Sequence, residues 1–200
     1  MTQLAEEQVK DILAPHHSAL LRIILNAWED RKKCPDMAFK RTIANAMWDY
    51  MIKHARIEFD DTPGIHVIDR PNTCLLHFDS GIVLRFKKGD DNNLSRNYPT
   101  NFALDFNDPQ INLPSVPHAT RVEVLYIPDR EGVEIESIRV VKRNRDQPEW
   151  WYVIDTEAAA NVHELPARGN ATDNRQQTRT RVAVKKTAQK KESSPTSSSG

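Results

Sequence analysis

Acidic and basic side chains gather around a predicted hairpin, in a pattern related to that of metal-dependent nucleases. Restriction-type nucleases use one acid, then an acid-x-lysine on the next strand, to hold a metal ion and activate water. The residue two positions before Lys87 is Arg85, which cannot bind a cation. We therefore interpret Arg85 and Lys87 as the solvated face of a strand and keep a nuclease as the second alternative function. The acids of this pattern are Asp60, Asp61, Asp69 and Asp79.

A second pattern has the residue types of a zinc site. His77 and Asp79 are two positions apart, so their side chains share one face of a strand, and His66 and Cys74 are near in sequence. Zinc sites more often show tight, paired spacings. We interpret the pattern as a polar strand entering a turn, and we predict no metal and no cofactor.

Other catalytic patterns are missing from the sequence. No G-x-S-x-G occurs, and the loop at residues 87–93 has one glycine and acids that would repel phosphate. Cys34 and Cys74 form no C-x-x-C and look structural, which is typical of a reducing compartment. The N-terminus has no basic start and no apolar run. These features favour a cytoplasmic protein that is not an enzyme and does not enter a membrane.

The first third of the chain is predicted to be helical. Residues 5–13 predict a short helix that stops before Pro15. Residues 18–33 predict a second helix, because apolar side chains recur at the helical period. A third follows at residues 36–57, capped by Asp36. The expected stripes are Leu21, Ile24, Leu25 and Trp28 on the second helix, and Phe39, Ile43, Met47, Tyr50 and His54 on the third.

From residue 62 onward the apolar period changes to two, which is typical of strands. Strands are predicted at residues 73–78, 82–87, 120–127, 133–142 and 150–154, with a β-bulge between Ile135 and Ile138. Residues 89–119 are predicted to be a long irregular connection. The whole is an α+β fold, with a helical pair at residues 1–58 packed on a roughly five-stranded antiparallel sheet at residues 72–155. Together they form one domain, residues 1–160.

The zero net charge of the 200-residue chain conceals an asymmetry. Residues 168–192 carry eight basic and two acidic side chains, so the rest is acidic by six charges. Residues 161–200 have few apolar side chains and are predicted to be a disordered basic tail. Such a tail either solubilises the protein or binds nucleic acid non-specifically. The residues that would bind nucleic acid are Arg175, Arg179, Arg181, Lys185, Lys186, Lys190 and Lys191.

Several short segments, taken in sequence order, resemble those of a poorly characterised bacterial and prophage protein family. The runs are residues 81–88 (GIVLRFKK), 97–100 (NYPT), 113–117 (LPSVP), 124–126 (VLY) and the pair Trp150-Trp151. Members of that family are encoded beside helix-turn-helix regulators with a zinc-peptidase-like domain. The resemblance implies one component of a toxin–antitoxin or phage-defence pair, and it assigns no catalytic residue.

We therefore expect a non-enzymatic protein that docks a partner protein, and a homo-oligomer is also compatible with the sequence. Trp150, Trp151 and Tyr152 alternate between the two faces of a terminal strand, so one face exposes Trp151 unless a partner covers it, or the helical pair covers one face and the long connection the other. A nucleic-acid-binding accessory protein is the first alternative. The expected partner-binding residues are Arg85, Lys87, Tyr98, Trp151 and Tyr152.

Overall fold

The computed structural model describes residues 3–34, 37, 39–70, 73–95, 100–113, 116 and 118–154. All of them belong to one of the two units into which the chain divides, residues 1–163. The predicted tail lies outside the described residues. None of the described helices has the length and apolar content needed to cross a bilayer.

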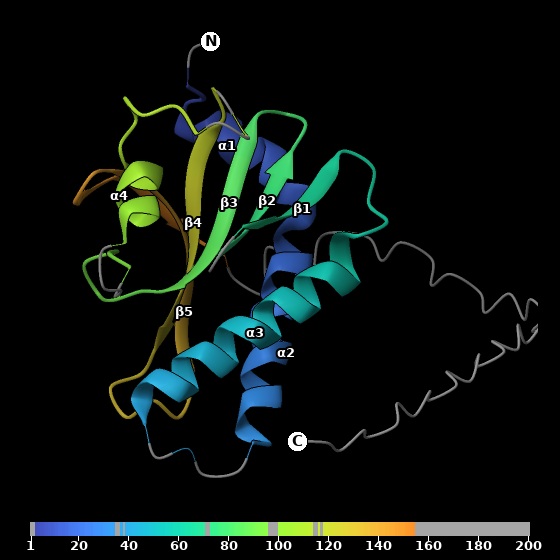
Figure 1. Cartoon of the computed structure of the whole chain (residues 1–200), viewed down its shortest axis with the longest axis vertical. Helices are drawn as coiled ribbons and strands as arrows, with labels where there is room; N and C mark the ends of the chain where they lie inside the picture. Colours follow the sequence, from blue (N-terminus) through green and yellow to red (C-terminus); the bar gives the residue numbers. More distant parts are fainter. Residues whose placement is uncertain are drawn as a thin grey trace, which may run out of the picture. The chain divides into compact units, whose positions relative to one another are not determined.

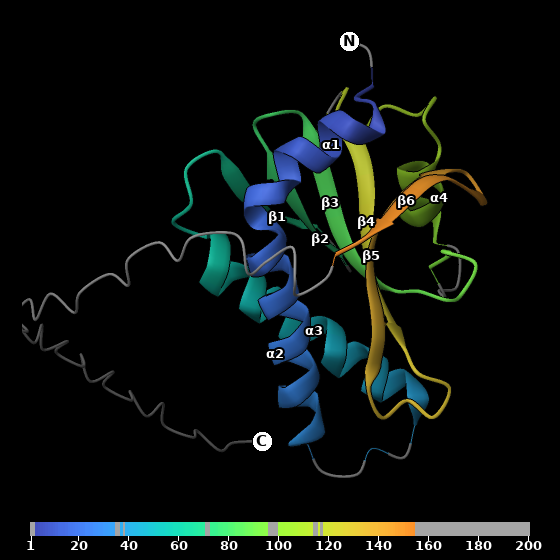
Figure 2. The same cartoon turned by 180° about the vertical axis from the view of Figure 1, so that it is seen from behind.

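The N-terminal helices form one layer of the fold (Figures 1 and 2). Helix α1 spans Glu6–Leu13 and α2 spans His17–Lys32, and the 3-10 turn η1 at Ala14–His16 joins them. Helix α1 therefore ends before Pro15, as predicted. Pro15 stands at the start of the 3-10 turn, where its missing N–H costs nothing. Helix α3 spans Lys40–Phe59.

Helices α2 and α3 run in opposite directions. Arg22 of α2 pairs with Glu58 of α3 at 2.8 Å. Asp30 lies later in α2 and accepts from His54, which lies earlier in α3, at 2.9 Å. This confirms the predicted helical pair. Three details were wrong: α3 begins at Lys40, not at Asp36, and both Leu25 and Phe39 of the predicted stripes are exposed. The buried stripe of α3 repeats every four residues: Met47, Met51, Ala55 and Phe59.

The second layer is a six-stranded mixed sheet in the order β1-β2-β3-β4-β5-β6. The predicted five-stranded antiparallel sheet was therefore wrong in two respects. Strand β1 was missed, and β3 pairs with β4 in parallel. The strands are β1 Ile65–Arg70, β2 Thr73–Phe78, β3 Ile82–Lys88, β4 Thr120–Pro128, β5 Ile135–Asn144 and β6 Gln147–Val153.

The parallel pair follows from the connection between its strands. Antiparallel neighbours can be joined by a tight turn, but parallel neighbours need a crossover of a dozen or more residues. Residues 89–119 supply that crossover, and part of what we predicted to be irregular is helix α4, Asn101–Asn107. Thr100 caps α4 by accepting from the amide N–H of Ala103 at 3.2 Å.

The predicted β-bulge is confirmed. Ile127 of β4 lies opposite Ser137 and Pro128 lies opposite Ile135, so Glu136 is the extra residue. The extra residue shifts the alternation of side chains along β5, so that Ile135, Ile138 and Val140 all pack against the helix-facing core. A second irregularity, next to Glu149, separates the pair Lys142–Trp150 from the pair Arg143–Pro148.

Each sheet face has its own core. The face toward α1–α3 is entirely apolar at its centre, with Leu84, Val122, Val124 and Val140 against the helices. The other face packs Leu75 and Val83 against Phe106 of α4 and against the following loop. Figure 2 shows α1 and α2 on one side of the strands and α4 on the other. We call this second face the α4 face.

Candidate functional site

A buried ion pair lies at the centre of the α4 face. Arg85 of β3 and Glu123 of β4 are directly opposed in the parallel register. The Arg85 Nε donates to Glu123 Oε1 at 2.9 Å, and its Nη2 donates to the same oxygen at 2.5 Å. The side chains are 2% and 1% exposed. The prediction that Arg85 lies on a solvated face was therefore wrong.

Helix α4 covers this ion pair. The Phe106 ring centroid is 4.1 Å from the Arg85 guanidinium carbon, and Asn107 Oδ1 accepts from Arg85 Nη2 at 3.3 Å. On the far side, Arg143 Nη1 approaches Glu123 Oε2 at 3.7 Å. Burial lowers the pKa of the Arg85 guanidinium, and Glu123 opposes that effect. The cluster fixes the position of α4 and of the crossover on the sheet.

Lys87 extends the charged region along β3. Burial and the nearby Arg85 lower the pKa of its ammonium to about 8. The side chain is only partly accessible. It is therefore less solvated than we predicted for a partner-binding residue.

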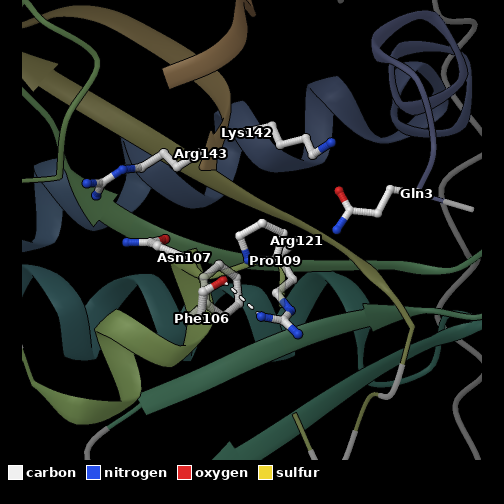
Figure 3. Close-up of a pocket in the computed structure, with 7 residues that line it drawn as sticks. All are labelled: Gln3, Phe106, Asn107, Pro109, Arg121, Lys142 and Arg143. Atoms are coloured by element: carbon white, nitrogen blue, oxygen red, sulfur yellow. Dashed lines mark hydrogen bonds between the residues drawn. The ribbon is translucent and has the colours of Figure 1, made fainter. Parts of the chain in front are cut away.

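A small pocket opens where α4, the N-terminal segment and β5 meet. Its lining is rich in cations: Gln3, Phe106, Asn107, Pro109, Arg121, Lys142 and Arg143 (Figure 3). These cations already have partners. Arg121 donates to the carbonyl of Asp105 at 2.8 Å, Lys142 to Glu149 at 2.9 Å and Arg143 to Ser95 at 2.9 Å. The pocket is best explained by the docking of α4 on the sheet.

Strand β6 presents the apolar surface that the sequence predicted in part. Trp151 is 44% exposed and Val153 is 47% exposed, and both lie on the α4 face. The Arg139 guanidinium lies 4.9 Å from the centroid of the Trp151 ring system, so it covers part of that ring. Among the described residues no strand pairs with the outer edge of β6.

The opposite side of β6 is packed under the N-terminal helices. His17 Nε2 and the Tyr152 hydroxyl are 3.2 Å apart, and the Lys10 ammonium lies 5.4 Å from the Tyr152 ring centroid. Trp150 stacks on Tyr152. Tyr152 therefore belongs to the helix-facing side, whereas Trp151 is the most exposed of the described members of the predicted set. Tyr98 and the seven basic tail residues lie outside the described residues.

The candidate zinc residues come together. The ligand atoms of His66, His77 and Asp79 all lie within 4.8 Å of one another. Cys74 does not join them, because it is buried on the other sheet face, where burial raises the pKa of its thiol to about 11. The nuclease pattern is not assembled in the described residues: Asp69 is held by Arg56 at 2.6 Å, and only Asp79 lies in the histidine group.

Sequence reasoning missed Glu123, Arg143 and Val153. A signal for Glu123 was present, because it is an acid in the otherwise apolar run Val122–Ile127, and a buried charge demands a partner. Pairing it with Arg85 required the parallel register, which the antiparallel prediction excluded. Val153 was placed in the last strand, but nothing in the sequence distinguished it as exposed.

Comparisons of the chain with family models, with curated proteins and with solved structures find no significant match. The function must therefore be argued from the chain's own residues.

Proposed function

We propose that this chain is a non-enzymatic binding protein that docks a partner protein along strand β6. The observation that carries the proposal is the pair Trp151 and Val153, exposed side by side on the outermost strand of the sheet. An edge strand can pair with another chain, and adjacent exposed apolar side chains mark a candidate interaction surface. The resemblance to the prophage family suggests that the partner is encoded beside this protein.

The edge supplies two kinds of contact. An extended segment of a partner can add to the outer edge of β6, with which no described strand pairs, and this provides affinity that does not depend on sequence. Trp151 and Val153 alternate with inward-facing residues, so they project from the same side and provide specificity. Tryptophan is a frequent anchor in interfaces because it buries a large area with few rotatable bonds.

The strand is held rigid in advance of binding. Tyr152 is fixed by its contact with His17, and Lys142 of β5 is bridged to Glu149 of β6 at 2.9 Å. A rigid edge loses little conformational entropy when a partner is added. Arg139, held by Asn93 at 2.7 Å, sets a positive charge beside the tryptophan. We therefore infer a partner segment that combines apolar and acidic side chains.

The test replaces Trp151 with alanine in the full chain and measures binding to the proteins encoded by neighbouring genes. Affinity for the true partner should fall by about 30-fold or more, since anchors of this type contribute about 2 kcal/mol or more. The thermal midpoint should change little because the side chain is half exposed. Equal affinity of wild type and Trp151→Ala for every captured protein would exclude this edge as the interface.

Ile57→Ala is a matched control. Ile57 is 70% exposed on α3, which contacts β1 at the opposite end of the sheet order from β6. The Ile57→Ala change, like Trp151→Ala, removes an exposed apolar side chain, but from the surface of α3. Binding should survive this change, and loss in both variants would indicate non-specific adhesion rather than docking on β6.

A nucleic-acid-binding accessory role is a second candidate. This role is favoured by the net charge of +6 at residues 168–192, which contrasts with the net negative charge of the rest of the sequence. Lysine and arginine in such a segment release counterions from phosphates, so affinity falls steeply with salt. The test is a gel shift that compares the full chain with a chain ending at Ala160. Equal binding by both, or binding by neither, contradicts the tail hypothesis.

A further inference from the structure

Two imidazoles and one carboxylate converge at the β1–β2 hairpin, at the opposite end of the sheet order from β6. His66 and His77 are directly opposite in the antiparallel register, and Asp79 follows two residues after His77. All three side chains therefore lie on the α4 face of the sheet. The His66 and His77 rings stack with centroids 5.9 Å apart. We propose that these residues bind one divalent transition-metal ion of the zinc class.

The backbone holds the three ligands at fixed positions. The paired strands set the spacing of the two histidines, since opposed residues on one face have neighbouring Cβ atoms. The amide N–H of Asp79 donates to the Gly64 carbonyl at 2.8 Å, which ties the end of β2 to the turn before β1. Gly64 has a φ of +79°, a conformation natural for glycine. The site is thus built on strands and a tight turn.

The distances are compatible with a tetrahedral ion. Ligands about 2.0–2.1 Å from zinc lie about 3.3 Å from one another in a tetrahedron. The ligand atoms here lie within 4.8 Å of one another, and His66 Nε2 lies 2.8 Å from Asp79 Oδ1. Binding would widen this hydrogen bond by about half an ångström and draw His77 inward. Both changes need only side-chain rotation, because the His66 and Asp79 side chains are 55% and 64% exposed.

The donor types select the kind of metal. Imidazole nitrogen suits zinc, cobalt, nickel and copper, whereas magnesium and calcium prefer sites made of oxygen ligands. Three protein ligands leave a fourth position of a tetrahedral ion for water or for a group from another molecule. The site would therefore be open to solvent or to a partner.

The test titrates Zn²⁺ and Co²⁺ into the full chain by calorimetry, with Mg²⁺ as the comparison ion. The cluster should bind one Zn²⁺ and should not bind Mg²⁺. His77→Ala and Asp79→Ala should each weaken the zinc affinity by about 10-fold or more. Unchanged far-UV circular dichroism and thermal midpoints should show that these exposed or half-exposed changes leave the fold intact.

His118→Asn is the matched control, since His118 is exposed, stands outside the cluster and has a φ of +68°, which asparagine tolerates. It should bind Zn²⁺ like wild type. Bound Co²⁺ should broaden the imidazole NMR signals of His66 and His77 before those of other histidines. Equal zinc affinity in all four proteins, or broadening that spares His66 and His77, overturns the proposal. Neither result bears on partner docking at β6.

Discussion

The Arg85–Glu123 pair places two full charges in an interior that would otherwise be apolar. Removing ions from water is costly, and the mutual attraction of the pair only partly offsets that cost. The pair here is fully buried and Glu123 also faces Arg143. We infer that the pair favours the observed β3–β4 register, because a shifted register would leave both charges without partners.

Removing one member of the pair should be far more harmful than removing both. Glu123→Leu leaves the buried Arg85 uncompensated, and we expect a loss of about 3–5 kcal/mol in the free energy of unfolding. The double variant Arg85→Met/Glu123→Leu should be more stable than the single variant. Urea denaturation of four proteins measures this: wild type, Glu123→Leu, Arg85→Met and the double variant. A double variant with the summed loss of both single variants would contradict the role of the pair.

Lys87 should make stability depend on pH through its depressed pKa. The folded-state pKa is about 8, whereas the unfolded value is 10.5. Below pH 8 both states are protonated and the full burial penalty is present. Between these values only the folded state loses the proton, so the penalty is relieved as pH rises. Lys87→Met should therefore be more stable than wild type at pH 7, by on the order of 1 kcal/mol.

That advantage should shrink as the pH is raised from 8 toward 10.5. Cys74 titrates in the same range with the opposite sign, because its folded pKa is raised. It is present in both proteins, so the difference between wild type and Lys87→Met isolates Lys87. Thermal or urea unfolding at several pH values provides the measurement. A difference that stays constant from pH 7 to pH 10 would show that Lys87 is fully solvated.

The sequence was informative about residue types but less so about burial. Alternation correctly placed Arg85 and Lys87 on one face of β3 and Phe86 on the other. It could not show that α4 covers the polar face, since that depends on the course of the crossover. His66, His77 and Asp79 were recognised as compatible with a metal site, but their convergence required β1, which sequence reasoning did not predict.

At the scale of elements, the sequence predicted the helices and strands that depend on apolar periodicity within a single segment. Helices α2 and α3, strands β2 to β5 and the bulge in β5 follow from apolar periodicity within single segments. Strand β1 was missed because Ile65–Arg70 is short and carries His66, Asp69 and Arg70. The parallel pairing was missed because it is set by long-range contacts of α4, a helix of only seven residues.

Helix α4 depends on Arg121 of β4 for its C-terminal end. The guanidinium donates to the backbone carbonyls of Asp105, Asp108 and Ile111, at the end of the short helix and in its following turn. The last carbonyls of a helix have no partner within the helix. Arg121→Met should cost about 2 kcal/mol and should increase amide hydrogen exchange within α4. The amides of α2 and α3 should keep their protection at early times.

Arg145→Met is the control for this prediction. Arg145 also reaches the end of α4, where it pairs with Asp108 at 3.1 Å, but its side chain is largely exposed. An exposed pair contributes less than about 1 kcal/mol. Equal loss of α4 protection in both variants would mean that the crossover is held by its apolar contacts rather than by Arg121.

At the scale of the molecule, the two cores of the described residues belong to one unit, residues 1–163. Every buried apolar residue of the described ranges lies between Val9 and Ile154. The last of them, Ile154, is tied to β5 by its N–H, which donates to the Ile138 carbonyl at 2.9 Å. The sheet edge at β6 and the histidine cluster at β1 both lie within this unit.

A chain ending at Ala160 should therefore unfold at nearly the same temperature as the full chain. Removing residues 161–200 deletes no core member among the residues that the structure describes, and the free energy of unfolding comes mainly from buried apolar area. Partner docking at β6 and zinc binding should also survive, whereas any affinity for nucleic acid should be lost. Calorimetric unfolding of both chains tests this. A midpoint that falls by more than about 4 °C would show that the C-terminal segment contributes on the order of 1 kcal/mol or more to the fold.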